Sequence, residues 1–83
     1  MSKFTKGAWR LEDKNRQVYC GMFPIANISY EFLPLSEAEA NARLIMYAPK
    51  MYEFLNRVLK EVDNADIQSD IISLLKNIDD ENI

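Results

Sequence analysis

Three basic residues recur at intervals of seven in the middle of the chain, and their spacing suits the binding of an anion. They are Arg43, Lys50 and Arg57. On a helix, an interval of seven brings side chains to nearly one line, with a drift of about 20° per heptad. Because an arginine can bind a phosphate through two parallel hydrogen bonds, this line of basic residues favours a phosphorylated ligand.

Aromatic and amide side chains accompany the basic line. Tyr47 follows Arg43 by four residues and precedes Lys50 by three. An aromatic ring can stack on a base, while a guanidinium binds phosphate and an amide binds the ribose or a base edge. The ligand-binding residues that this pattern predicts are Asn41, Arg43, Tyr47, Lys50, Asn56 and Arg57.

The same residues also have a purely structural interpretation. Glu39 precedes Arg43 by four residues, and Glu53 precedes Arg57 by four. This is the favourable orientation for ion pairs within a helix, each worth about 0.2–0.5 kcal/mol. In this alternative the basic line is only a solvated helix face, and Tyr47 belongs to the core or to an interface between copies.

Residues that support catalysis or hold metals are scarce. The chain has no histidine, which is the commonest general base, and its single cysteine, Cys20, is more typical of a small buried hydrophobe than of a nucleophile. A zinc site normally needs four cysteine, histidine or acidic ligands. Two glycines leave no Gly-rich phosphate loop. We therefore expect a binding protein that is not an enzyme and holds neither metal nor cofactor.

Length and charge restrict the class further. A chain of 83 residues predicts a single domain, 1–83, which buries only about 60% of its unfolded surface, so association with further copies is expected. The net charge of -3 makes the binding of nucleic acid through overall electrostatic attraction unfavourable. Neither a signal peptide nor an apolar stretch of membrane-spanning length is present, which predicts a protein of a reducing compartment with no membrane partner.

Strand periodicity extends over residues 8–32. Three short segments alternate apolar and polar residues, and their apolar members are Trp9 and Leu11, then Val18, Cys20 and Met22, then Ile28, Tyr30 and Phe32. Three such segments with short links predict an antiparallel β-meander. Pro24 either ends the second strand or marks an edge strand, because it cannot donate a ladder hydrogen bond.

Helical periodicity follows over residues 36–63 and 66–79. Ser36 and Glu39 have the spacing of a capping box. Pro49 should kink or break the first segment, giving either one bent helix or two helices over about 37–47 and 49–63. Asp66 is a candidate cap of the last helix. The predicted fold is therefore α+β, with a three-stranded antiparallel sheet followed by two or three helices.

The stretch EANARLIMYAPKMYEFLNRVL, residues 39–59, resembles a signature of small bacteriophage and prophage proteins. The usual form of that signature is close to EANARLIAAAPELLEALE, after a short β-region that begins with a tryptophan. The chain has Met46 and Tyr47 where small alanines are usual. It keeps Glu39, Ala40, Asn41, Ala42, Arg43, Leu44, Ile45, Ala48 and Pro49.

One characterised group that is similar is the first family of Thoeris anti-defence proteins. The resemblance implies a phage protein in the cytoplasm of the infected bacterium, which sequesters a cyclic ADP-ribose isomer or a cyclic oligonucleotide without cleaving it. It also implies a dimer or higher oligomer, and basic residues near the C-terminal helix that contact the ligand. In this chain that helix offers Lys76, which the resemblance thus adds as the seventh candidate ligand residue. The alternative is an interaction module that inhibits a host or phage protein by docking its helical or acidic surface.

Overall fold

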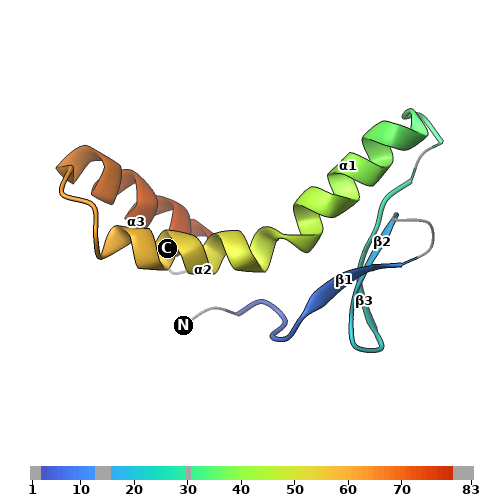
Figure 1. Ribbon diagram of the computed structural model, residues 1–83, viewed down its shortest axis with the longest axis horizontal. Coiled ribbons are helices and arrows are strands. Elements are labelled where there is room, and N and C mark those ends of the chain that lie inside the picture. Colours follow the sequence, from blue (N-terminus) through green and yellow to red (C-terminus); the bar gives the residue numbers. More distant parts are fainter. Residues whose placement is uncertain (1–2, 13–15, 30, 80–83) are drawn as a thin grey trace. The chain divides into compact units, whose positions relative to one another are not determined.

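A computed structural model describes residues 3–12, 16–29 and 31–79 of the chain. A three-stranded antiparallel sheet precedes three helices (Figure 1), which confirms the predicted α+β fold. The chain divides into two compact units, Thr5–Pro49 and the combination of Met1–Phe4 with Lys50–Ile83. We describe each unit by itself, and the single domain expected from the length stays a prediction.

The sheet consists of β1 (Trp9–Glu12), β2 (Gln17–Cys20) and β3 (Phe23–Asn27), with β2 in the centre. Cys20 pairs with Phe23, so a two-residue turn joins β2 to β3. Gly21 begins this turn at a φ of 60°, a conformation that glycine adopts without a steric cost. The strand expected to continue through residue 23 therefore ends at Cys20.

The third strand lies earlier in the chain than its alternation indicated. The described residues between 28 and 33 form no strand, so the prediction of a strand that reaches Phe32 was wrong. Tyr30, which belonged to the same prediction, lies outside the described residues. Pro24 lies within β3, which is an edge strand, as one of the two alternatives required. The register shifts between Val18 and Tyr19, which marks a bulge beside this proline.

Helix α1 (Leu35–Met46) packs on the sheet through small side chains. Ala38 and Ala42 are four residues apart and fully buried, as is Val18 of β2, while Cys20 is 8% exposed. Residues four apart share one face of a helix, and their methyl groups let the helix backbone approach the strands closely. The core of this unit is therefore small and is closed by its own elements.

The start of α1 is held by the backbone and not by a capping box. The carbonyl of Pro34 accepts hydrogen bonds from the amides of Glu37 and Ala38, at 3.0 and 3.1 Å, and no side chain caps this end. The helix begins at Leu35, so Ser36 already lies inside it. The prediction that Ser36 and Glu39 form a capping box was wrong, because the box requires its serine at the N-cap.

The segment before β1 covers the buried cysteine. The Cys20 thiol donates to the carbonyl of Lys6 at 3.2 Å, and the Trp9 indole N–H donates to the carbonyl of Thr5 at 3.1 Å. A Cβ on Gly7 would lie 2.8 Å from the Cys20 sulfur, and the φ of Gly7 is 123°. Only glycine fits this close approach, which makes Cys20 a packed structural residue.

The helical segment is broken and not bent. Helix α1 ends at Met46 and α2 (Ala48–Leu59) begins two residues later, with the amide of Tyr47 donating to the carbonyl of Arg43 at 3.1 Å. Pro49 lacks an amide hydrogen, and in a continuous helix its ring would collide with the carbonyl of Ile45. The predicted segment 36–63 is therefore two helices followed by a turn.

Helices α2 and α3 (Ala65–Asp79) lie side by side in opposite directions (Figure 1). The Asn64 side-chain oxygen accepts from the amides of Asp66 and Ile67 at 2.9 and 3.0 Å, so Asn64 caps α3 and the prediction of Asp66 as the cap was wrong. None of the described helices has the length and hydrophobicity needed to span a membrane.

The hairpin of α2 and α3 has a thin core. Ile71 and Leu75 of α3 are 7% exposed, whereas no residue of α2 is buried. The Tyr52 hydroxyl donates to the carboxylate of Asp79 at 2.5 Å and joins the two helices, and the Phe4 ring contacts the Tyr52 ring edge-on at 5.0 Å between centroids. A polar pair thus accompanies the few apolar contacts that close this unit.

Candidate functional site

The residues predicted to bind a ligand lie on both compact units. Asn41, Arg43 and Tyr47 belong to the unit Thr5–Pro49, and the other four belong to the helical hairpin. Because α1 ends at Met46, the seven-residue interval from Arg43 to Lys50 does not run along one helix. The interval from Lys50 to Arg57 does lie within α2.

The two arginines of the basic line are exposed and lack the ion pairs of the structural interpretation. Within the described residues, no ion pair joins Glu39 to Arg43 or Glu53 to Arg57. The Arg57 guanidinium instead lies 5.6 Å from the ring centroid of Phe54, a cation–π distance. Neither arginine is therefore neutralised by the glutamate one turn before it.

The remaining predicted residues differ in their surroundings. Asn56 is half-buried, and its amide nitrogen donates to the carbonyl of Tyr52 at 3.4 Å, so part of its hydrogen-bonding capacity serves the helix. Asn41, Lys50 and Lys76 are exposed, and Tyr47 is 48% exposed. All seven positions stay predictions for a ligand site, and Asn56 has the clearest structural role among them.

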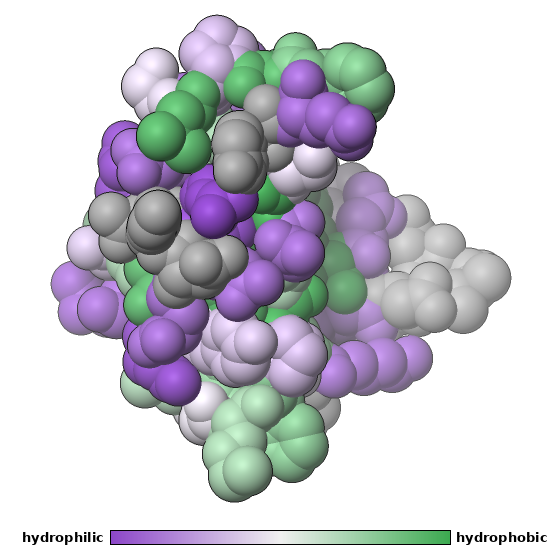
Figure 2. Space-filling view, turned by 90° about the vertical axis from the view of Figure 1, so that its right-hand side faces the viewer, coloured by the Kyte–Doolittle hydropathy of each residue, from purple (hydrophilic) through white to green (hydrophobic). Residues whose placement is uncertain are grey.

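Large apolar side chains are exposed on both units. The ones with the greatest exposure are Met22 and Phe32, both 89%, and Phe23, 71%. Figure 2 shows hydrophobic surface at the bottom of the view, where β2 turns into β3; Met22 lies in this turn and Phe23 begins β3. On the helical hairpin, Met51, Phe54, Ile67, Leu74 and Ile78 are each 43–56% exposed. Where such side chains form a contiguous patch, the patch is typical of a surface that contacts another molecule.

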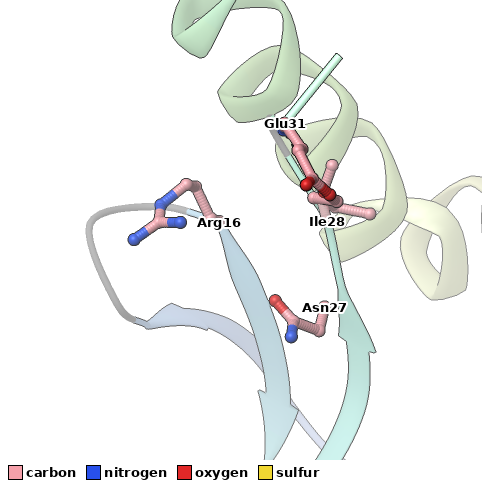
Figure 3. A pocket seen from close by; sticks show the side chains of 5 residues that line it. Arg16, Asn27, Ile28 and Glu31 are labelled. Atoms are coloured by element: carbon pink, nitrogen blue, oxygen red, sulfur yellow. The ribbon is translucent and has the colours of Figure 1, made fainter. Parts of the chain in front are cut away.

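A shallow depression of about 410 Å³ lies beside the sheet, at a place the sequence did not indicate. Its lining consists of Arg16, Asn27, Ile28, Ser29 and Glu31. Figure 3 shows Arg16 at the start of β2 on one side, with Asn27, Ile28 and Glu31 on the other. The amide of Ile28 donates to the carbonyl of Arg16 at 2.9 Å, which brings the two sides together.

The depression does not select clearly for an anion, because Glu31 shares it with Arg16. None of the seven predicted ligand residues lines it. Its two sides come from residues 11 or more positions apart, which become neighbours only when β2 and β3 pair. Spacing along the chain therefore carried no signal for this feature. Among the described residues, no group of three or more acidic or cysteine side chains is placed to hold a metal ion.

Comparison with known proteins places the chain in a phage protein family. The model of a family described as Salmonella phage P22 protein Y8K6 matches residues 1–81, which is nearly the whole chain. No curated protein and no solved structure matches the chain. The phage origin indicated by the stretch from Glu39 to Leu59 agrees with this match. The chain belongs to the family of Salmonella phage P22 protein Y8K6.

Proposed function

We propose that this phage-family protein binds and sequesters a small anionic nucleotide-type signal, a cyclic ADP-ribose isomer or a cyclic oligonucleotide, in the cytoplasm of the infected bacterium. The supporting observation is that Arg43 and Arg57 are exposed without ion pairs to Glu39 and Glu53. A guanidinium that is not already paired can offer its full set of donors to a phosphate.

Sequestration fits the chemistry of the chain better than turnover does. Binding requires hydrogen-bond donors and an aromatic ring, and exposed residues offer them on each unit by itself: Arg43 and Tyr47 on Thr5–Pro49, and Arg57 on the helical hairpin. It requires no general base, and the chain has no histidine. The net charge of -3 means that attraction to an anion must come from these local groups and not from the whole molecule. The ligand should therefore be released unchanged.

A thermal-shift experiment tests this function. The purified protein is mixed with cyclic ADP-ribose isomers and with cyclic di- and trinucleotides. A ligand at 100 times its dissociation constant should stabilise the protein by about 2.7 kcal/mol, enough to raise Tm by several degrees. The ligand recovered after denaturation should be chemically intact by liquid chromatography.

Matched variants separate a site from a general charge effect. Arg43→Ala and Arg57→Ala should each lower the apparent affinity, obtained from the ligand-induced shift in Tm, at least tenfold. Lys60→Ala should leave this affinity unchanged, because Lys60 is an exposed basic neighbour outside the predicted set. If none of these ligands shifts Tm, the protein does not sequester this class of signal. An equal effect of all three substitutions would also reject the assigned residues.

A second candidate, docking on a host or phage protein, is favoured by the exposure of Met22, in the turn after β2, and of Phe23, at the start of β3, which are 89 and 71% exposed. Aromatic residues and methionine are enriched in protein interfaces. A target captured from host lysate and identified by mass spectrometry should be lost with Met22→Ser or Phe23→Ser. It should be retained with Leu44→Ser, a 62% exposed apolar residue on α1. Retention by all three variants would reject this surface.

A further inference from the structure

We propose that a second copy of this chain covers one apolar face of the hairpin of α2 and α3, so that the two copies form a four-helix interface. The hairpin face, as we call it, consists of Met51, Phe54, Ile67, Leu74 and Ile78, which are 43, 56, 46, 47 and 47% exposed. This inference rests on different residues from the proposed ligand site and goes beyond that function.

The apolar residues of α3 occupy two neighbouring strips of the helix. Ile71 and Leu75 form the buried strip, on the same side of α3 as Asp79, whose carboxylate accepts the hydrogen bond from Tyr52 of α2. Ile67, Leu74 and Ile78 are separated by seven and four residues, and at about 100° per residue they fall within about 40° of one another. This second strip lies beside the buried one, and α2 leaves it about half exposed. Helix α3 therefore has apolar surface for two neighbours and contacts one in its own chain.

The exposed residues of both helices lie on the same side of the hairpin. The hydrogen bond from Tyr52 to Asp79 marks one side of the contact between the helices. On α2, Met51 and Phe54 lie between about 100° and 160° around the helix from Tyr52. On α3, Ile67, Leu74 and Ile78 lie about 100–140° around the helix from Asp79. Both rotations have the same sense when each helix is viewed from its N-terminus. In two antiparallel helices, equal rotations from residues that face each other lead to the same side of the pair, so the two sets share one face.

The hairpin needs this additional layer to complete a core. Its buried apolar residues among those described are Ile71 and Leu75, and α2 contributes none. Segments below about 40 residues usually require a metal, disulfides or association to fold stably. Among the described residues there is no group that could hold a metal, and Cys20 is a free thiol in the other unit.

A second copy fits the size of the face. Five side chains of this kind at about half exposure present on the order of 400 Å² of surface. Two such faces together remove about 800 Å², and the polar rim brings the total near the ~1,000 Å² that a specific interface requires. An interface of this size fits two hairpins laid face to face.

Charge favours an arrangement in which α2 of one copy faces α3 of its partner. Helix α2 carries Lys50 and Arg57 against one acidic residue, Glu53, whereas α3 carries Asp66 and Asp70 on its exposed surface, with Lys76 as its basic residue. A two-fold axis parallel to the helices produces this pairing and makes every neighbouring pair antiparallel. The more basic helix then lies beside the more acidic one.

Sedimentation equilibrium of the full chain over 1–200 µM tests the proposal. We expect a dimer for the wild type and at least a tenfold weaker dimer for Leu74→Ser. Ile72→Ser is the matched control, because Ile72 lies on the same helix, is 40% exposed, and lies on the flank of α3 away from the hairpin face. A wild-type monomer throughout, or equal weakening by Ile72→Ser, overturns the proposal.

A measurement on the wild type covers the case in which Leu74→Ser fails to fold. In a mixture of isotope-labelled and unlabelled protein, filtered nuclear Overhauser spectra report only contacts between copies. We expect such contacts between the Phe54 ring and the side chains of Leu74 or Ile78. A dimer whose contacts instead involve Met22, Phe23 or Phe32 would show that another surface associates.

Discussion

The two compact units use the same kinds of side chain but close their cores to different degrees. In the unit Thr5–Pro49, Val18, Ala38 and Ala42 are fully buried between the sheet and α1. In the helical hairpin, Ile71 and Leu75 are 7% exposed and α2 has no buried residue. A sheet covered by a helix forms two layers with a shared interior, whereas two helices alone leave one face of each without cover.

The difference teaches that the size of the side chains between the elements, and not their hydrophobicity, decides which unit closes its apolar core. Alanines on α1 let the helix lie close to β2, so a few small side chains fill the space. The buried residues of the hairpin, Ile71 and Leu75, are larger than alanine, and Phe54 and Leu74 stay about half exposed. We therefore expect stability of the first unit to be independent of protein concentration and that of the hairpin to depend on it.

The largest effect should come from filling the closed core. Ala42→Leu forces three extra carbons into a fully buried position between α1 and the sheet, and should cost about 3 kcal/mol, or more than 10 °C in Tm. Trp9, the single tryptophan, lies on β1 of this unit, so its fluorescence during thermal unfolding reports the loss. Ala40→Leu is the control, since Ala40 is exposed on the same helix. A comparable loss from Ala40→Leu would contradict the packing of α1 described above.

An intermediate effect should come from the polar pair of the hairpin. Tyr52→Phe removes the hydroxyl that donates to the carboxylate of Asp79, which is 6% exposed and whose other oxygen has no partner in the described residues. A buried polar group left without a partner costs about 1–3 kcal/mol. Helicity at 222 nm should therefore be lost at lower temperature, while the Trp9 signal changes less.

Two further variants sharpen this measurement. Tyr52→Phe combined with Asp79→Leu should recover part of the loss, because replacing both partners by apolar groups can be nearly neutral. Tyr19→Phe, a half-buried tyrosine of the sheet whose hydroxyl makes no hydrogen bond in the described part of the chain, should change stability by less than about 0.5 kcal/mol. If the double variant is less stable than Tyr52→Phe alone, the pair does not act as a unit.

The fold class was predictable because alternation and helical spacing are strong over whole segments, but the boundaries were not. Alternation continues from Val18 through Met22 without a break, although the chain reverses at Gly21. Gly21 could have indicated the reversal, because glycine is favoured at the first position of a two-residue hairpin loop. Its apolar neighbours on both sides instead made the segment resemble one continuous strand. Pro49 did indicate the break in the helix, since its effect is local and steric.

The candidate site was less predictable than the fold. The line of Arg43, Lys50 and Arg57 assumed one helix, and the interruption at Tyr47 separates the first residue from the other two. The expected ion pairs are weak enough that solvent competes with them, so spacing could not decide whether they form. The depression at Arg16 and Asn27 depends on strand pairing, which no local pattern reveals.

The smallest effect should come from the helix starts, where the sequence offered two plausible caps and both were wrong. Asn64→Ala removes the oxygen that accepts from the amides of Asp66 and Ile67, and should cost the hairpin about 1 kcal/mol in thermal unfolding followed at 222 nm. Ser36→Ala should change stability by less than about 0.5 kcal/mol, because Ser36 lies inside α1 and caps nothing. The contrast follows from position, since a side-chain oxygen helps only from the residue before the first turn, where the free amides point. A loss from Ser36→Ala as large as that from Asn64→Ala would mean that the capping box forms in solution and that α1 begins two residues later, at Glu37.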